Sequence, residues 1–239
     1  MRKVAVLMAM LATALFSIVG VAYAVEKTQY LETKTTGSKG SKKKPRTLKL
    51  RVNTGVSANV PAENGTFANS KTTISLDKNL KFNNRKFPYC SEQTVLTNES
   101  KCPAASKVGT GSVAAVAGPG GNVKVAPKVT AYNARGNKLL LKLTKAPGDP
   151  VDSTGVITGT LKNASGKFGK KLEVPIPAKY QQQLGLFITL QKFDVTISKT
   201  YKGLAYIQST GCTGGKYNFA GAYTYTDGTT FQTTSTSKC

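Results

Sequence analysis

The chain has 239 residues, with 34 Lys and Arg against 11 Asp and Glu, a formal net charge of +23, and neither histidine nor tryptophan. The absence of histidine excludes a Ser-His-Asp triad, a Cys-His nucleophile and the usual zinc and copper ligand sets. The absence of tryptophan and an aromatic content of 8% weigh against a sugar-stacking platform and an aromatic-lined groove for nucleic acid.

Residues 1–24 are predicted to be a signal peptide. A short positive start precedes an uncharged, mostly apolar run from Val4 to Val21, and Ala22-Tyr23-Ala24 supplies the small residues that a signal peptidase accepts. The run is also long enough for an uncleaved membrane anchor, but the cleavage-like tripeptide favours removal. In either case we expect the rest of the chain outside the cytoplasm, secreted or in the cell envelope.

Residues 25–46 are predicted to form a basic flexible linker, because Thr33 to Arg46 lacks apolar periodicity and carries a dense positive charge. Its most basic stretch, Lys42, Lys43, Lys44 and Arg46, is a candidate contact to an anionic surface, with a solvated spacer as the alternative. The other lysines are scattered along the chain, which favours solvated strand faces over one focused site. An anionic cell-surface polymer is the partner we expect from the charge, and nucleic acid is disfavoured.

Residues 47–239 are predicted to be one β domain, because apolar and polar residues alternate with a period of two from Thr47 onward. Turn signals separate the segments at short, regular spacing, which is typical of all-β folds. The expected strands are 47–52, 73–76, 108–116, 123–132, 138–143, 154–161, 171–176, 186–197, 217–225 and 229–234.

Two pairs of these segments are predicted to be hairpins. Residues 133–137 hold the Gly and Asn of a tight turn, and Thr226-Asp227-Gly228 holds an Asp-Gly pair that tolerates positive φ. The fold class we expect is an antiparallel β-sandwich, with a partly closed β-barrel as the alternative. A single short helix is expected near 178–184, following a proline.

The four cysteines are predicted to form two disulfides, as an oxidising compartment allows. Three connectivities are possible, and pairing of sequence neighbours is the most economical: Cys90 with Cys102, and Cys212 with Cys239. A zinc site is disfavoured, because the chain has no C-x₂-C spacing and no histidine.

No catalytic, cofactor-binding or metal-binding residues are predicted. Two carboxylates could still hydrolyse glycosides, so a secreted carboxylate-dependent hydrolase is the alternative function. Most of the acidic residues have structural interpretations in turns or on solvated strand faces. The candidates are Glu63, Asp77, Glu92, Glu99, Asp149, Asp152, Glu173, Asp194 and Asp227.

Several phrases of the sequence stand out together: Lys-Lys-Pro-Arg at 43–46, Phe-Pro-Tyr-Cys at 87–90, the stretch 101–111, Gly-Gly-Lys-Tyr-Asn-Phe at 214–219, Asp-Gly-Thr at 227–229, and Cys239. Taken together, they resemble an uncharacterised group of secreted bacterial β-rich proteins. The resemblance covers most of the mature chain, with 90–111 its most specific part. It implies an exported β domain with two disulfides, and it carries over no functional residue.

The sequence therefore predicts an exported, non-enzymatic β-sandwich with a structural or binding role at the cell surface or in the extracellular space.

Overall fold

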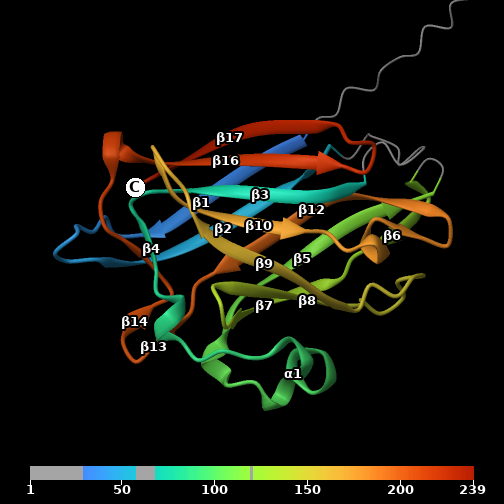
Figure 1. Ribbon diagram of the computed structural model, residues 1–239, viewed down its shortest axis with the longest axis horizontal. Coiled ribbons are helices and arrows are strands. Elements are labelled where there is room, and N and C mark those ends of the chain that lie inside the picture. Colours follow the sequence, from blue (N-terminus) through green and yellow to red (C-terminus); the bar gives the residue numbers. More distant parts are fainter. Residues whose placement is uncertain (1–28, 58–67, 119–120) are drawn as a thin grey trace, which may run out of the picture.

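A computed structural model describes residues 29–57, 68–118 and 121–239 (Figure 1). The described part is mostly antiparallel β structure, and 15 strands form one sheet in the order β17-β16-β3-β10-β9-β8-β7-β5-β12-β2-β15-β4, with β1 beside β2, β11 beside β12 and β6 beside β5. Its strands are β1 (Gln29–Gly37), β2 (Arg46–Val56), β3 (Asn69–Asp77), β4 (Leu80–Phe82), β5 (Lys107–Ala117), β6 (Val123–Val125), β7 (Lys128–Ala134), β8 (Lys138–Thr144), β9 (Gly155–Asn163), β10 (Phe168–Pro175), β11 (Gln182–Gln183), β12 (Leu186–Ile197), β15 (Ile207–Ser209), β16 (Lys216–Tyr225) and β17 (Thr230–Lys238).

The predicted all-β sandwich is confirmed. In Figure 1 the part of the sheet that holds β17, β16 and β3 lies above the part that holds β7 and β8. Apolar side chains from both parts pack into one core, which includes Ile74, Val129, Leu141 and Phe219. The alternation seen in the sequence is the cause: in β16 every second residue from Tyr217 to Tyr225 is buried.

The two ends of the sheet meet through hydroxyl groups. Ser235 Oγ accepts from the backbone N–H of Thr33 (3.1 Å), and Ser237 Oγ accepts from that of Thr35 (2.8 Å). The Thr35 hydroxyl also donates to the Lys238 carbonyl (2.9 Å). Since no backbone ladder joins β1 to β17 in the described strands, the sheet is not a closed barrel, and these contacts form what we call the hydroxyl seam.

The prediction of a flexible linker at 25–46 is wrong for residues 29–37 and for Arg46, which lie in paired strands. Residues 29–37 form β1, which pairs with β2 from Gln29↔Val56 to Gly37↔Leu48. Gln29 and Leu31 are buried on the inner face, so a short alternation precedes the basic stretch. The dense positive charge begins only in the turn between the two strands. The linker prediction treated this charged turn and the strand before it as one segment, and therefore missed β1. The folded unit begins before residue 47.

The helix expected near 178–184 is reduced to a 3-10 turn at Ala178–Tyr180. Gln182 and Gln183 pair with β12 instead, since Leu184 and Gly185 adopt positive φ and turn the chain back. The one α-helix of the described part is α1 (Glu92–Thr97), which the sequence did not predict. The Ser91 side chain caps it by accepting from the Thr94 N–H.

Both predicted disulfides are present. Cys90–Cys102 has a Cα–Cα distance of 5.3 Å and closes the segment that contains α1, while Cys212–Cys239 has a Cα–Cα distance of 6.3 Å and ties the end of β17 to the turn before β16. Both distances suit disulfide geometry. The described part of the chain contains no free cysteine.

The predicted signal peptide, 1–24, lies outside the described residues. Within 29–57, 68–118 and 121–239, none of the helices has the length and apolar character that a bilayer crossing requires.

The hydroxyl seam yields a first prediction. Replacing Ser235 and Ser237 together by alanine leaves two edge N–H groups of β1 without partners and should lower the free energy of unfolding by about 1 kcal/mol per position. Urea unfolding with the disulfides intact measures this loss. The matched control is Thr234→Val with Thr236→Val on the exposed face of the same strand, where removing hydroxyls should change stability by less than about 0.5 kcal/mol. Equal losses in both variants would contradict the seam.

Candidate functional site

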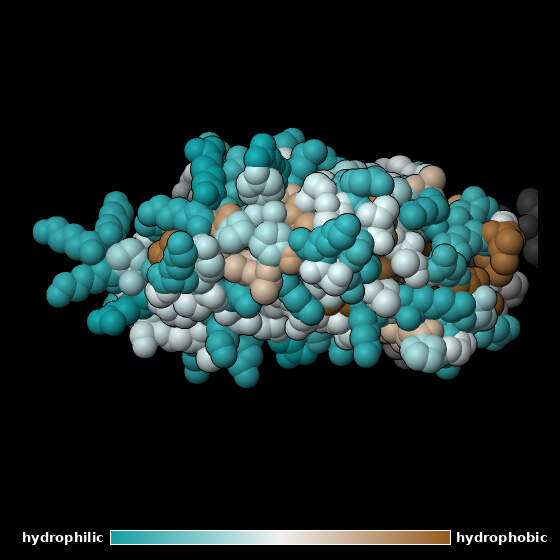
Figure 2. Space-filling model, turned by 90° about the horizontal axis from the view of Figure 1, so that it is seen from below, coloured by the Kyte–Doolittle hydropathy of each residue, from teal (hydrophilic) through white to brown (hydrophobic). Residues whose placement is uncertain are grey.

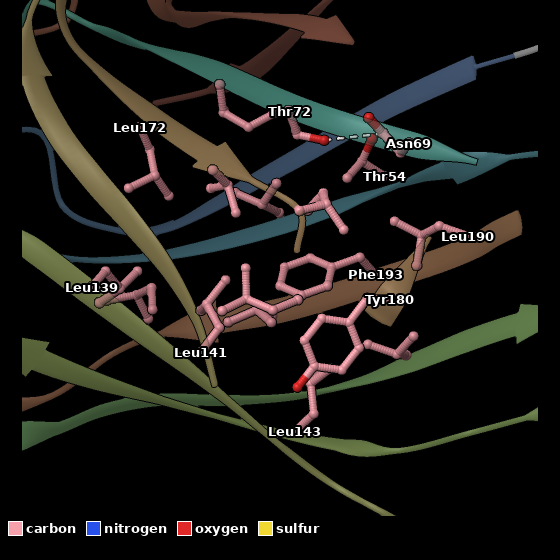
Figure 3. Close-up of a pocket in the computed structure, with 18 of the residues that line it drawn as sticks. Thr54, Asn69, Thr72, Leu139, Leu141, Leu143, Leu172, Tyr180, Leu190 and Phe193 are labelled. Carbon is pink, nitrogen blue, oxygen red and sulfur yellow. Dashed lines mark hydrogen bonds between the residues drawn. The ribbon is translucent and has the colours of Figure 1, made fainter. Parts of the chain in front are cut away.

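The inner face of the sheet encloses a cavity of about 200 Å³. Its walls are almost wholly apolar and come from strands on both sides of the fold, as Figure 3 shows for Leu139, Leu141, Leu172, Leu190 and Phe193. Such a cavity, with few polar groups at fixed places, is the usual form of a small-molecule binding site.

The cavity exists because β9 and β10 separate. They pair only between Thr160–Asn163 and Lys170–Glu173, so the first half of β9 has no ladder with β10. Gly159 lies beside the gap, where a Cβ atom would approach Leu172 Cδ1 to 3.0 Å. The space between the two strands is consequently filled by side chains and by a crossing segment, rather than by backbone hydrogen bonds.

The crossing segment, residues 177–185, is called the strap below. It is anchored beside β3 by a bond from Ile176 N to Ser70 O (2.9 Å) and lies beside β9 at Tyr180, whose hydroxyl is 3.5 Å from Thr154 O. The ring of Tyr180 lines the cavity (Figure 3). A Cβ at Gly155, whose φ is +151°, would collide with the Tyr180 hydroxyl, so only glycine lets the strap lie this close.

One end of the cavity meets a buried polar network. Thr54 Oγ1 shares a hydrogen bond with Tyr223 Oη (2.6 Å) and accepts from Gln29 Nε2 (3.1 Å), while Tyr225 Oη donates to Gln29 Oε1 (2.8 Å). Burial, opposed by the bonds to Thr54 and Gln29, raises the pKa of Tyr223 to about 12. The network is therefore neutral at physiological pH.

Two residues that line the cavity each hold a polar atom that has no hydrogen-bond partner in the described part of the chain and almost no accessible surface. These atoms are Asn69 Oδ1 and Ser153 Oγ, and each residue is only 7% exposed. Asn69 uses its Nδ2 to donate to Thr72 Oγ1 (3.1 Å), which leaves its carbonyl oxygen unpaired (Figure 3). A third unpaired hydroxyl, on the fully buried Thr189, does not line the cavity.

Charge is nearly absent from the cavity. Among its described lining residues none is acidic, and Lys138, which is exposed, is the one basic residue. The wall therefore offers a ligand dispersion contacts and burial of apolar area.

None of the candidate carboxylates that the structure describes lines the cavity. Three of them form ion pairs that lower their pKa: Glu173 with Lys162 and Lys171, to about 2; Asp194 chiefly with Arg51; and Glu99 chiefly with Lys142. Within the described residues no set of three or more acidic or cysteine side chains could hold a metal ion.

The remaining described candidates accept hydrogen bonds from other residues, and Glu63 lies outside the described residues. The buried Asp77 accepts from the backbone of Asn79 and Asn218 (2.8 Å each). The others accept as follows: Glu92 from Thr158, Asp149 from Ala126 N, Asp152 from Thr154 N and Asp227 from Thr229 N.

The basic residues predicted to contact an anionic surface do lie together. Lys42, Lys43 and Lys44 occupy the turn between β1 and β2, Arg46 begins β2, and all four are exposed. The turn is ordered: Gly40 N donates to Ser209 Oγ (3.1 Å), and Ser41 N donates to Lys44 O (3.1 Å). Figure 2 shows hydrophilic side chains projecting at the end of the molecule where this turn lies in Figure 1.

Comparison with known proteins adds nothing to these observations: no protein-family model, no curated protein and no solved structure matches this chain. The resemblance to a group of secreted bacterial proteins stays a prediction.

The cavity could not be predicted from the sequence. Inward-facing leucines and valines give the same alternating pattern whether they pack against other side chains or line a cavity. Two signals were available. Gly155 and Gly159 sit within a predicted strand, where glycine often marks a close approach, and Asn69 opens a strand whose next residues are polar on both faces.

The polar network yields a second prediction, for alkaline pH. The pKa of an unfolded tyrosine is about 10, so between pH 10 and 12 the unfolded chain releases a proton that folded Tyr223 keeps, and stability falls as pH rises. Tyr223→Phe should remove a contribution on the order of 2 kcal/mol to this loss. Urea midpoints at pH 9 to 11.5 measure it, with Tyr89→Phe, at a residue that is 43% exposed, as the control. Parallel curves for the wild type and Tyr223→Phe would contradict it.

Proposed function

We propose that this chain is an exported, non-enzymatic binding domain that holds a small apolar molecule in its internal cavity. The cavity itself is the observation that supports this function. A space of about 200 Å³ with apolar walls exceeds the roughly 150 Å³ cavity that binds benzene in an engineered protein core.

The energetics favour an occupant. Leaving cavity volume in a core costs about 24 cal/mol per Å³, so a void of about 200 Å³ forgoes on the order of 5 kcal/mol of stabilisation. A ligand that fills it recovers part of that energy as binding free energy. Selection for stability alone favours larger side chains at positions such as Ala115, which lines the cavity.

Export is supported by the predicted signal peptide and by the two disulfides, which persist in oxidising compartments. The binding role is favoured over a carboxylate-dependent hydrolase, because the described candidate carboxylates have structural partners and the cavity is lined by apolar side chains. No cofactor is part of the proposal.

A cavity-filling substitution tests the function. The wild type should bind p-xylene with a dissociation constant on the order of 0.1 to 1 mM, as expected for an apolar ligand of this size. Ala115→Leu places three more carbons in the cavity and should abolish binding without lowering the thermal midpoint. The measurement is titration followed by NMR and thermal unfolding.

The control is Ala222→Leu, the same substitution on the outward face of β16. It should bind p-xylene like the wild type. If neither the wild type nor the control binds p-xylene or any similar apolar probe, the cavity has no ligand-binding role.

A second candidate function is contact with an anionic cell-surface polymer through the basic turn, residues 38–46. The observation that favours it is the order of the turn, which holds three consecutive lysines and an arginine at one end of the molecule. Clustered cations release counterions from a polyanion, so the affinity should fall with salt.

Charge-neutral variants test this contact. Lys42→Gln, Lys43→Gln and Lys44→Gln together should weaken binding to heparin and reduce the slope of log affinity against log salt by about 2. The control removes the same net charge from separate exposed positions, by Lys71→Gln, Lys128→Gln and Lys216→Gln. Titrations at several salt concentrations compare the two. Equal losses in both variants would show that overall charge, and not the turn, binds the polymer.

A further inference from the structure

We infer that the tip of the strap inserts into the surface of an anionic lipid membrane. The strap tip is the two-residue turn Leu184-Gly185, which joins β11 to β12. The inference goes beyond the proposed function, which concerns a small ligand of the cavity. The observation that carries it is one leucine that is both exposed and strained: Leu184 is 90% exposed and has a φ of +51°.

Neither property suits a leucine whose role is structural. Gln183 pairs with Leu186, so Leu184 and Gly185 form a tight hairpin turn with positive φ at both positions. Such turns favour Asn, Asp or Gly, because other side chains are strained at positive φ. The exposed side chain also leaves apolar area in water. Stability alone therefore favours asparagine at position 184, and a strained, exposed leucine indicates a functional contact with an apolar environment.

The strap tip lies at the end of the molecule away from the basic turn. β2 begins at Arg46 in that turn, and Thr54 near its far end pairs with Phe193 of β12. The residues before Phe193 continue in the same direction. In Figure 1 the segment that leads into β12, drawn in orange, lies at this end, and Figure 2 shows hydrophobic side chains there. The strap tip can therefore meet a surface without the basic turn.

A lipid surface fits the strap tip better than a protein partner does. Among the described residues the other exposed large apolar side chains are Tyr89 and Leu96, and neither belongs to the strap or to β12. A stable protein interface buries about 800 Å² on each partner, far more than one projecting side chain provides. A fluid lipid phase needs no complementary surface, so a few apolar side chains with cations beside them are sufficient.

Cations accompany the strap tip. Lys179 of the strap is exposed, and its carbonyl accepts from Gln183 Nε2 (2.8 Å). Lys145, also exposed, and Lys179 both lie near the Asp152 carboxylate, which offsets part of their charge. The chain as a whole carries a formal net charge of +23. Its attraction to anionic lipid adds to the insertion of the leucine.

The contact has a consequence for the cavity, which rests on the proposed function. Tyr180 and Gln183 of the strap line the cavity, so a strap tip in the membrane places part of the cavity wall beside the lipid. A small apolar molecule dissolved in the membrane is then close to the proposed binding site.

An asparagine substitution tests the contact in the mature chain, residues 25–239. Leu184→Asn should weaken binding to vesicles of phosphatidylcholine and phosphatidylglycerol about tenfold or more, because the burial of one leucine side chain is lost. Its thermal midpoint should stay the same or rise, since asparagine tolerates positive φ. The matched control is Leu96→Asn, at the exposed leucine of α1, which should bind vesicles like the wild type. Vesicle co-sedimentation and thermal unfolding measure the two properties.

A fluorescent reporter locates the contact. The chain has no tryptophan, so Leu184→Trp carries a single indole. Its emission should move to shorter wavelengths when these vesicles are added, because the ring enters a less polar environment. The emission of Leu96→Trp, the matched control, should not move.

Several results would overturn the inference: no vesicle binding by the wild type, an equal loss in Leu184→Asn and Leu96→Asn, a fall in the thermal midpoint of Leu184→Asn, or unchanged emission of Leu184→Trp. Vesicle binding that is lost in the triple Lys42→Gln, Lys43→Gln and Lys44→Gln variant but kept in Leu184→Asn would assign the contact to the basic turn instead. A dimer that Leu184→Asn dissociates, without vesicle binding, would assign the strap tip to a second copy. The binding of p-xylene is measured separately, so each of these results leaves the proposed function standing.

Discussion

The whole structure depends on one sheet covering its own inner face. A sheet with one apolar face needs something packed against that face, and here the opposite part of the same sheet provides it. The hydroxyl seam completes the arrangement, because it brings β1 against β17 without a backbone ladder. Inward side chains from both parts of the sheet thereby face a common interior, in which a local gap between strands leaves a cavity.

The separation of β9 and β10 decides where that space lies. A full ladder between them would draw the walls together, and Leu172 and Val174 would pack where the cavity is now. Where the ladder between β9 and β10 is missing, the strap crosses the gap. Glycine at position 155 allows Tyr180 of the strap to lie close to the start of β9. The apolar walls and the crossing segment thus share one structural origin.

Prediction from the sequence succeeded wherever the signal was local. Alternation gave the main strands, the Asp-Gly turn gave the β16–β17 hairpin, and spacing gave both disulfides. It failed where contacts distant in the sequence determine the secondary structure. Residues 29–37 form a strand because they pair with β2, and Gln182, which was expected in a helix, pairs with β12 instead. The cavity could not be predicted, because it depends on the divergence of two strands and not on the residue types within them. The basic residues were found, but their ordered turn was not.

The anchoring of Gly40 to Ser209 has a consequence for the proposed contact between the basic turn and an anionic polymer. A flexible linker must lose backbone freedom when it is captured, at roughly 1–2 kcal/mol for each residue fixed. In this chain the backbone of residues 38–46 is already held between two paired strands, and a Cβ at residue 40 would strike the Ser209 carbonyl. Capture of a polyanion there requires ordering of lysine side chains only, so the encounter resembles docking of a rigid patch and not folding upon contact.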